Sequence, residues 1–263
     1  MVEKRSSVHN ALMILKSFSM DNPEMGVTEL AEKMNLAKST IHRILKTLAS
    51  EGFVYKNPTT NKYSLGSTIL ALTNTVNNQM NIIHDATPVL NTLTEKTGEN
   101  AYLSILESDE VIYLKRIEAE AEFLDDTYLG ARNPLHCTSS GQVFLAYLQE
   151  KSQINWLQLR LHTYTTKTIT NIHHLTLRIE QIREQGYAVS NEEYMEGVIS
   201  ISAPIFNEKN EVIAAITVAG PVSRLGQVQL KHKEVVEKVI QASIELTRLI
   251  KRRKAKSKYK TVF

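Results

Sequence analysis

The apolar residues between positions 27 and 46 have a spacing that strongly restricts the local fold. They fall where two short helices, joined by a tight turn, bury their side chains against each other: Leu30, Met34, Leu36, Ile41 and Ile44. Ala31 stands where a small side chain lets the two helices cross closely, and Asn35 stands in the turn, where it tolerates a left-handed backbone. The spacing predicts a helix-turn-helix with helices over 27–35 and 38–51.

The opposite face of the second predicted helix is cationic and rich in hydroxyl groups. It carries Lys38, Ser39, Thr40, His42, Arg43 and Lys46. A helix fits the major groove of B-DNA, where Arg can bind guanine through two hydrogen bonds and Ser or Thr can contact bases or phosphates. A solvated helix face shows the same residue types, and an isolated His is often a bystander. The DNA-binding interpretation therefore depends on the apolar spacing, the cationic helix face and the hairpin that follows, taken together.

A predicted hairpin follows these helices. Strand-like runs at 53–55 and 62–65 flank a turn cluster at 57–61. Lys56 and Lys62 add positive charge to the hairpin, which we expect to contact the DNA backbone as the wing of a winged helix. Together with a predicted helix at 7–19, these elements define an expected DNA-binding domain over residues 1–66.

The rest of the chain is predicted to form a connector, a second domain and a tail. Residues 67–81 are predicted to form a linker helix, residues 82–250 a domain of mixed helices and strands, and residues 251–263 a basic C-terminal tail. In the second domain we expect strands at 101–106, 111–116, 187–190, 198–206 and 212–219, and helices at 82–96 (broken at Pro88), 138–148, 150–161, 174–185 and 227–250. Strands linked as hairpins and flanked by helices are typical of an α+β fold.

Charge is distributed unevenly along the chain. The formal net charge is +3 over residues 1–66, −8 over 67–247 and +8 over 248–263. Basic ends suit polyanionic partners such as nucleic acid, although the tail can also be a plain solvated charge run, or can bind RNA or membrane anions. The uncharged runs are much shorter than the ~20 residues of a membrane-spanning helix, so we expect no membrane partner and a cytoplasmic location.

The last two predicted strands each have one bulky face and one small face. Side chains alternate along a strand, so in 198–206 and 212–219 the bulky aliphatic residues share one face. The small or hydroxyl-bearing faces include Val198, Ser200, Thr217 and Ala219. Such faces leave room for a ligand pocket, whereas the alternatives are a solvated sheet face or close packing against a helix.

A second candidate ligand contact is the start of the helix predicted at 138–148. Thr138, Ser139, Ser140 and Gly141 place hydroxyl groups and backbone N–H groups at that helix start. Helix N-termini favour anionic groups such as a carboxylate. Plain N-capping by Thr138 or Ser139 explains the same residues without a ligand.

The sequence gives little support for catalysis. His136 and Cys137 are adjacent in an extended segment, so their side chains point to opposite sides and are poorly placed for proton transfer. The chain contains no Gly-rich phosphate-binding motif, and with Cys137 as its single cysteine it suits neither structural zinc nor a disulfide scaffold. We expect no cofactor, no metal and no enzyme activity. A metabolic enzyme with a vestigial helix-turn-helix stays the alternative class.

Several segments resemble one family, the IclR family of bacterial transcription regulators. They are Val27–Ala31, Lys38–Leu48 and Glu51–Val54 in the N-terminal part, and Asn133–Gly141, Gly186–Ala188, Glu192–Glu193, Gly197, Ala203–Ile205 and Ala219–Pro221 in the C-terminal part. These motifs are short individually, but their order and spacing are specific. The resemblance covers about residues 7–250 and leaves out the basic tail.

The resemblance implies a winged helix-turn-helix that reads operator DNA, a linker helix, and a GAF-like domain that binds a small-molecule effector at the start of the 138–148 helix. It also implies homodimers, often assembled as dimers of dimers, on palindromic double-stranded operators. Most such proteins repress their operons, and some activate them. Ser139, Gln142 and the pair Ile199-Ser200 replace the residues that are usual in the family (Ala, Lys and Arg-Cys), which leaves the effector's identity open.

Overall fold

The computed structural model describes residues 6–19, 21–121, 123, 127–148, 160–226 and 229–259. The chain divides into two compact units, Met1–Met80 and Asn81–Phe263. The first is mainly helical with one hairpin, and the second combines a sheet with helices, which confirms the expected α+β fold.

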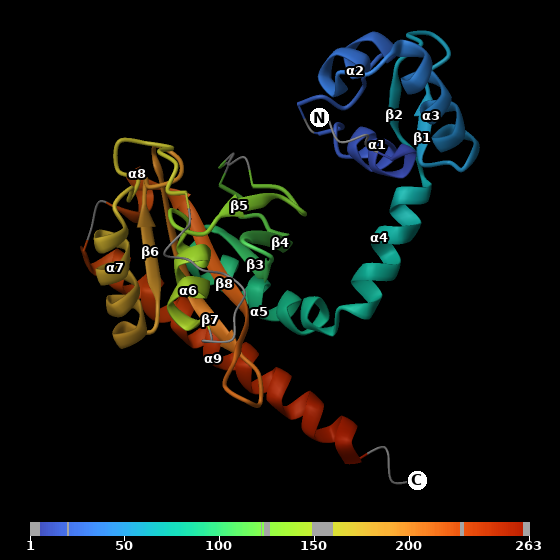
Figure 1. Cartoon of the computed structure of the whole chain (residues 1–263). Coiled ribbons are helices and arrows are strands. Elements are labelled where there is room, and N and C mark those ends of the chain that lie inside the picture. Colours follow the sequence, from blue (N-terminus) through green and yellow to red (C-terminus); the bar gives the residue numbers. More distant parts are fainter. Residues whose placement is uncertain are drawn as a thin grey trace. The chain divides into compact units, whose positions relative to one another are not determined.

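The first unit is a helix-turn-helix followed by a hairpin and one further helix (Figure 1). Its elements in chain order are α1 (Ser7–Leu15), α2 (Val27–Met34), α3 (Lys38–Ser50), β1 (Val54–Lys56), β2 (Tyr63–Leu65) and α4 (Thr68–Gln79). The two strands pair antiparallel, and Met25 forms an additional bridge to Tyr63 that ties the start of α2 to the hairpin. Helices α2 and α3 begin at the predicted residues, 27 and 38, and each ends one residue before the predicted end.

The apolar residues that predicted this motif form its core. Leu30, Ile41 and Leu45 are fully buried together with Ile14 of α1. Ala31 is 6% exposed in this core, and Asn35 ends α2 with a left-handed backbone (φ 52°), as the turn requires. Burial of one face of each helix therefore holds the three helices together.

The second unit is built on a six-stranded antiparallel sheet with the order β5-β4-β3-β8-β7-β6. The strands are β3 (Asn100–Glu107), β4 (Glu110–Ile117), β5 (Arg132–Pro134), β6 (Ala188–Asn191), β7 (Val198–Phe206) and β8 (Val212–Pro221). The helices are α5 (Asn81–Thr97), α6 (Ser139–Tyr147), α7 (Ile172–Gln185), α8 (Val222–Leu225) and α9 (Gln229–Tyr259). Helix α7 begins at an Asn171 N-cap and ends at Gly186, which has a left-handed backbone.

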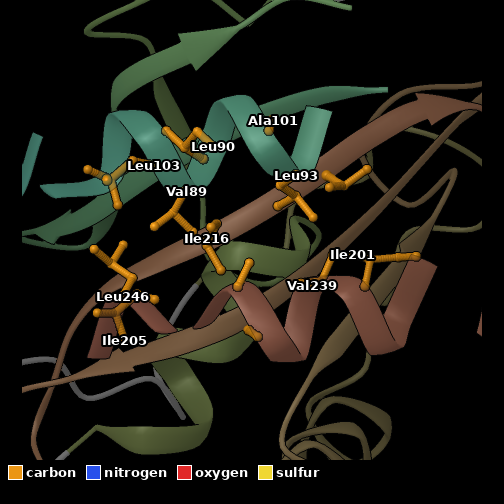
Figure 2. Packing of buried hydrophobic residues seen from close by; sticks show 14 of the residues in the cluster. Val89, Leu90, Leu93, Ala101, Leu103, Ile201, Ile205, Ile216, Val239 and Leu246 are labelled. Atoms are coloured by element: carbon orange, nitrogen blue, oxygen red, sulfur yellow. The ribbon is translucent and has the colours of Figure 1, made fainter. Parts of the chain in front are cut away.

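The two faces of the sheet are covered by different helices. The bulky residues of β7 and β8, such as Ile201, Ile205 and Ile216, pack against α5 and α9 in the larger core cluster (Figure 2). The small residues of the same strands, such as Ala215 and Ala219, belong to a second cluster with α6 and α7. The alternation predicted from the sequence thus places α6 over the small-residue face.

Three features differ from the sequence-based expectations. Pro88 lies inside a continuous α5 and does not break it; the apolar residues that follow it, Val89, Leu90 and Leu93, are buried against the sheet, and this packing offsets the lost backbone hydrogen bond. Helix α9 continues past residue 250 to Tyr259. Strand β5 was not anticipated. The helix predicted at 150–161 lies almost entirely outside the described residues.

Among the helices of the described segments, none combines the length and the apolar character needed to span a lipid bilayer.

The close crossing of α2 and α3 can be tested at Ala31. We expect Ala31→Leu to lower the free energy of unfolding of the N-terminal unit by about 2 kcal/mol, because the added side chain overpacks the core between the helices. The matched control is Glu32→Leu on the exposed face of the same helix, which should change stability by less than about 0.5 kcal/mol. Urea denaturation followed by circular dichroism measures both, and equal effects would contradict the crossing argument.

Candidate nucleic-acid interface and ligand pocket

Helix α3 presents its polar face to solvent. Lys38, Ser39, His42, Arg43 and Lys46 are exposed, and Thr40 is half-buried. On the opposite face, Ile41 and Leu45 are fully buried and Ile44 is 7% exposed. Within its unit, the structure therefore leaves uncovered the face that the sequence assigned to DNA.

The start of α3 also favours an anionic partner. Its N-cap residue is Ala37, which makes no side-chain capping bond, and its first turn contains no acidic residue. A helix N-terminus carries partial positive charge, and Lys38 adds a full charge next to it. These features suit a phosphate or an electronegative base edge at this end of the helix.

The two wing lysines have different surroundings. Lys56 is exposed, with its Nζ 6.0 Å from the centre of the Tyr63 ring. Lys62 instead forms an ion pair with Glu29 of α2 at 3.0 Å. Glu29 also accepts a hydrogen bond from the Gly26 backbone N–H, and this bond, followed by the Lys62 contact, lowers the pKa of Glu29. Lys56 is thus the freer of the two cations, and a phosphate at Lys62 would compete with Glu29.

A pocket lies between the start of α6 and the small-residue face of the sheet. Five of the residues predicted for a ligand site line it: Thr138, Val198, Ser200, Thr217 and Ala219. Seven further lining residues were not predicted: Tyr102, Tyr113, Thr127, Asn133, Ser190, Tyr194 and Met195. The pairing of β3 with β8 sets Tyr102 opposite Thr217, so strand order, which the sequence does not state, brings the tyrosines to the pocket.

The other three predicted residues lie behind the pocket wall. Ser139 is buried and bonds to Ser200 and Ser202, while Ser140 lies 3.3 Å from the Tyr113 hydroxyl. Gly141 packs against the preceding backbone: a Cβ added there would lie 2.4 Å from the Leu135 carbonyl oxygen. Because α6 lies so close to the segment before it, position 141 has no room for a side chain larger than that of glycine.

Thr138 acts as the N-cap of α6. Its Oγ1 accepts from the Gly141 N–H at 3.1 Å and donates to the Pro134 carbonyl at 2.7 Å. The capping interpretation of Thr138 is therefore confirmed, and it is compatible with a place on the pocket wall.

A buried charged cluster holds α6, α7 and the turn after β6 together. Glu193 is 5% exposed and bonds to Arg178 at 2.8 Å and to Gln142 at 2.6 Å. Arg178 also donates to the Val189 carbonyl. Burial raises the pKa of Glu193, while the Arg178 guanidinium acts in the opposite direction. The cluster fixes the turn that carries Tyr194 and Met195.

The histidine and cysteine before α6 are not arranged for nucleophilic chemistry. Cys137 is fully buried, and burial raises its pKa, so the thiol stays protonated at neutral pH. The His136 ring bonds through Nε2 to the His162 carbonyl oxygen. In the described part of the chain, no three His, Cys, Asp or Glu side chains are grouped so that they could hold a metal ion.

The chain matches two family models. Residues 7–58 match the IclR helix-turn-helix domain, and residues 74–248 match the bacterial transcriptional regulator IclR C-terminal domain. The chain belongs to the IclR family. It is a transcriptional regulator with a helix-turn-helix DNA-binding domain and a C-terminal effector domain, as the sequence resemblance implied.

Curated relatives and solved structures agree with this membership. The chain is 33% identical to the HTH-type transcriptional regulator XynR of Escherichia coli over 93% of this chain and 96% of that protein. It is 29% identical to the E. coli transcriptional repressor IclR, over 92% and 88% of the two chains. An IclR regulator from Alicyclobacillus acidocaldarius has the same fold, with a TM-score of 0.81 and 26% identity over 94% of this chain and 99% of that one.

Two adjacent glutamates allow a matched test of the buried cluster. We expect Glu193→Gln to destabilise the C-terminal unit by about 2 kcal/mol, because it leaves the partly buried Arg178 without its carboxylate. Glu192→Gln removes the charge of a more exposed pair with Lys167 and keeps a side-chain oxygen that can accept from the Gly197 N–H, so it should have little effect. Thermal unfolding of both variants compares them, and equal stability would contradict the structural role of Glu193.

Proposed function

We propose that this chain is a metabolite-responsive regulator, a repressor in its basal state, that reads a two-fold symmetric operator through α3. Lys38, Ser39, Thr40, His42, Arg43 and Lys46 contact the major groove, and Lys56 and Lys62 contact phosphates. Residues 1–66 bind DNA, residues 67–81 connect, and residues 82–250 sense the effector. The observation that carries the proposal is the uncovered cationic face of α3 above a fully buried apolar face.

The effector binds in the pocket between α6 and the sheet. The lining residues Thr138, Val198, Ser200, Thr217 and Ala219 contact it directly, and Ser139, Ser140 and Gly141 shape the wall behind them. A structural relative with 21% identity and a TM-score of 0.82 was solved as a complex with 4-hydroxybenzoate, which supports a small-molecule role for this domain. An effector shifts DNA affinity by as much as its own affinity differs between the two states of the protein.

We further propose that the regulator acts as a homodimer in the cytoplasm, with dimers of dimers as the larger assembly and without catalysis. Large apolar side chains are exposed in the N-terminal unit: Val8 and Leu12 on α1, and Leu70, Leu72 and Val76 on α4. Val8 and Leu12 share a face of α1, and Leu72 and Val76 share a face of α4, because residues four apart lie side by side on a helix. Exposed apolar faces of this kind mark interaction surfaces, and a two-fold dimer matches the symmetry of a palindromic operator.

The DNA-reading assignment predicts different effects for two cations. Arg43→Ala should weaken operator binding by about 1–3 kcal/mol and relax base specificity, because Arg43 contacts a base edge. Lys56→Ala, the matched control, should weaken binding to all sequences alike and reduce the slope of log affinity against log salt by about one. Fluorescence anisotropy with operator and scrambled duplexes measures both. Unchanged operator affinity in Arg43→Ala would refute the assignment of α3.

The pocket assignment predicts a separation of DNA binding from ligand response. Thr217→Phe fills the pocket, so the variant should bind operator DNA like the wild type but should no longer respond to effector. Thr176→Phe, on α7 away from the lining residues, is the control and should keep the response. Reporter expression with and without inducing metabolites measures this, and a normal response in Thr217→Phe would remove Thr217 from the site.

A further inference from the structure

Four hydroxyl groups form a hydrogen-bonded chain under the floor of the pocket. Ser139 Oγ donates to Ser200 Oγ at 2.8 Å, and Ser139 Oγ lies 2.7 Å from Ser202 Oγ. Ser202 Oγ in turn lies 2.7 Å from Thr217 Oγ1. Ser139, Ser202 and Thr217 are buried, and Ser200 and Thr217, the two ends of the chain, line the pocket.

The direction of this chain follows from proton counting. A hydroxyl has one proton to donate and two lone pairs that accept. Because Ser139 donates its only proton to Ser200, Ser202 must donate to Ser139, and Thr217 must then donate to Ser202. Ser200 accepts at the end of the chain and keeps its own proton. No described residue accepts that proton, so Ser200 offers an O–H donor to the pocket.

Two other lining hydroxyls have the opposite polarity. Ser190 Oγ donates to the Cys137 carbonyl at 2.7 Å, and Thr138 Oγ1 donates to the Pro134 carbonyl at 2.7 Å. A carbonyl oxygen can only accept, so both protons are committed to the backbone. Ser190 Oγ keeps two acceptor lone pairs, and Thr138 Oγ1, which already accepts from the Gly141 N–H, keeps one. The pocket therefore has a donor at Ser200 and acceptors at these two positions.

The described lining residues carry no formal charge, so recognition in this part of the pocket depends on hydrogen-bond polarity. We propose that Ser200 is a specificity-determining donor, oriented by Ser139, for a small hydroxylated carbonyl compound. The carbonyl or carboxylate oxygen of the ligand accepts from Ser200, and its hydroxyl groups donate to Ser190 and Thr138. This assignment rests on the proposed effector function of the pocket.

The hydrogen bond between Ser139 and Ser200 joins two residues that differ from those usual in the family. Ser139 and Ser200 stand at two of the positions where the sequence departs from the family's usual Ala and Cys. An Ala at 139 has no proton to donate, and a Cys at 200 is a weak donor. The two departures meet in one hydrogen bond, so they act together on the same ligand atom.

Matched probes test directly whether the pocket offers a hydrogen-bond donor at Ser200 and acceptors at Ser190 and Thr138. One set is glycerate, dihydroxyacetone, glycerol and propionate; a larger set is gluconate, glucitol and hexanoate. In at least one set, a member with both carbonyl and hydroxyl groups should bind about tenfold more tightly than the alditol and the alkanoate, measured by isothermal titration calorimetry on the full chain. The acid and the ketose members distinguish a carboxylate from a neutral carbonyl.

Two variants test the role of the hydroxyl chain. Ser200→Ala removes the donor, and Ser139→Ala removes the bond that orients it; both should reduce the preference for the hydroxylated carbonyl probe over the alditol by about tenfold. Ser243→Ala is the control, because Ser243 is a buried hydroxyl of α9 that donates to the Pro204 carbonyl of β7, and α9 covers the other face of the sheet. It should leave the ligand ranking unchanged.

The proposal is overturned if the alditol or the alkanoate binds best, if no probe binds, or if Ser139→Ala keeps the full preference. Operator binding by gel shift without probe is measured for each protein in parallel. Wild-type protein that binds no DNA would overturn the proposed function, whereas DNA binding with the wrong ligand ranking overturns only the assignment of Ser200. If a serine variant loses DNA binding, Ser200→Val takes its place. This variant also lacks the hydroxyl donor, so its preference for the hydroxylated carbonyl probe over the alditol should be reduced to the same extent.

Discussion

The division of α3 into a buried apolar face and an exposed polar face is the constraint on which the DNA-binding account depends. Ile41 and Leu45 lock the helix into the core of its unit, so the orientation of Arg43 and its neighbours is set by packing and not by their own contacts. A rigid helix can present several side chains to a groove at low entropic cost, because the backbone is already ordered before DNA arrives.

The same principle shapes the ligand pocket. Strands β7 and β8 bury their bulky residues against α5 and α9, which leaves the small and hydroxylic residues toward α6. Gly141 lets α6 approach the preceding backbone closely, and the Glu193 cluster fixes the turn that completes the wall. The pocket therefore exists because apolar packing on one face of the sheet determines what the other face can hold.

Sequence reasoning was most successful where the decisive contacts are local. The 3.6-residue period and the small Ala31 located α2 and α3, and the alternation of side chains identified Ser200 and Thr217. It missed Tyr102 and Tyr113, because their place in the pocket depends on the pairing of β3 with β8 and β4, strands far apart in the sequence.

Non-local contacts also explain the remaining differences. Lys62 pairs with Glu29, which is distant in sequence, so one of the two lysines predicted to contact the DNA backbone is engaged with α2. Pro88 does not break α5, because burial of the following turn against the sheet outweighs the local preference of proline. Periodicity contains no information about either effect.

The most direct test of the central claim is a dimethyl sulfate footprint of the operator bound by the full chain. The reagent methylates guanine N7 in the major groove, the atom that an arginine of α3 would cover. The account predicts protected guanines in two symmetric half-sites, with loss of one protected position per half-site in the Arg43→Ala complex. Tight operator binding with every guanine N7 still reactive, in wild type and variant alike, would contradict it.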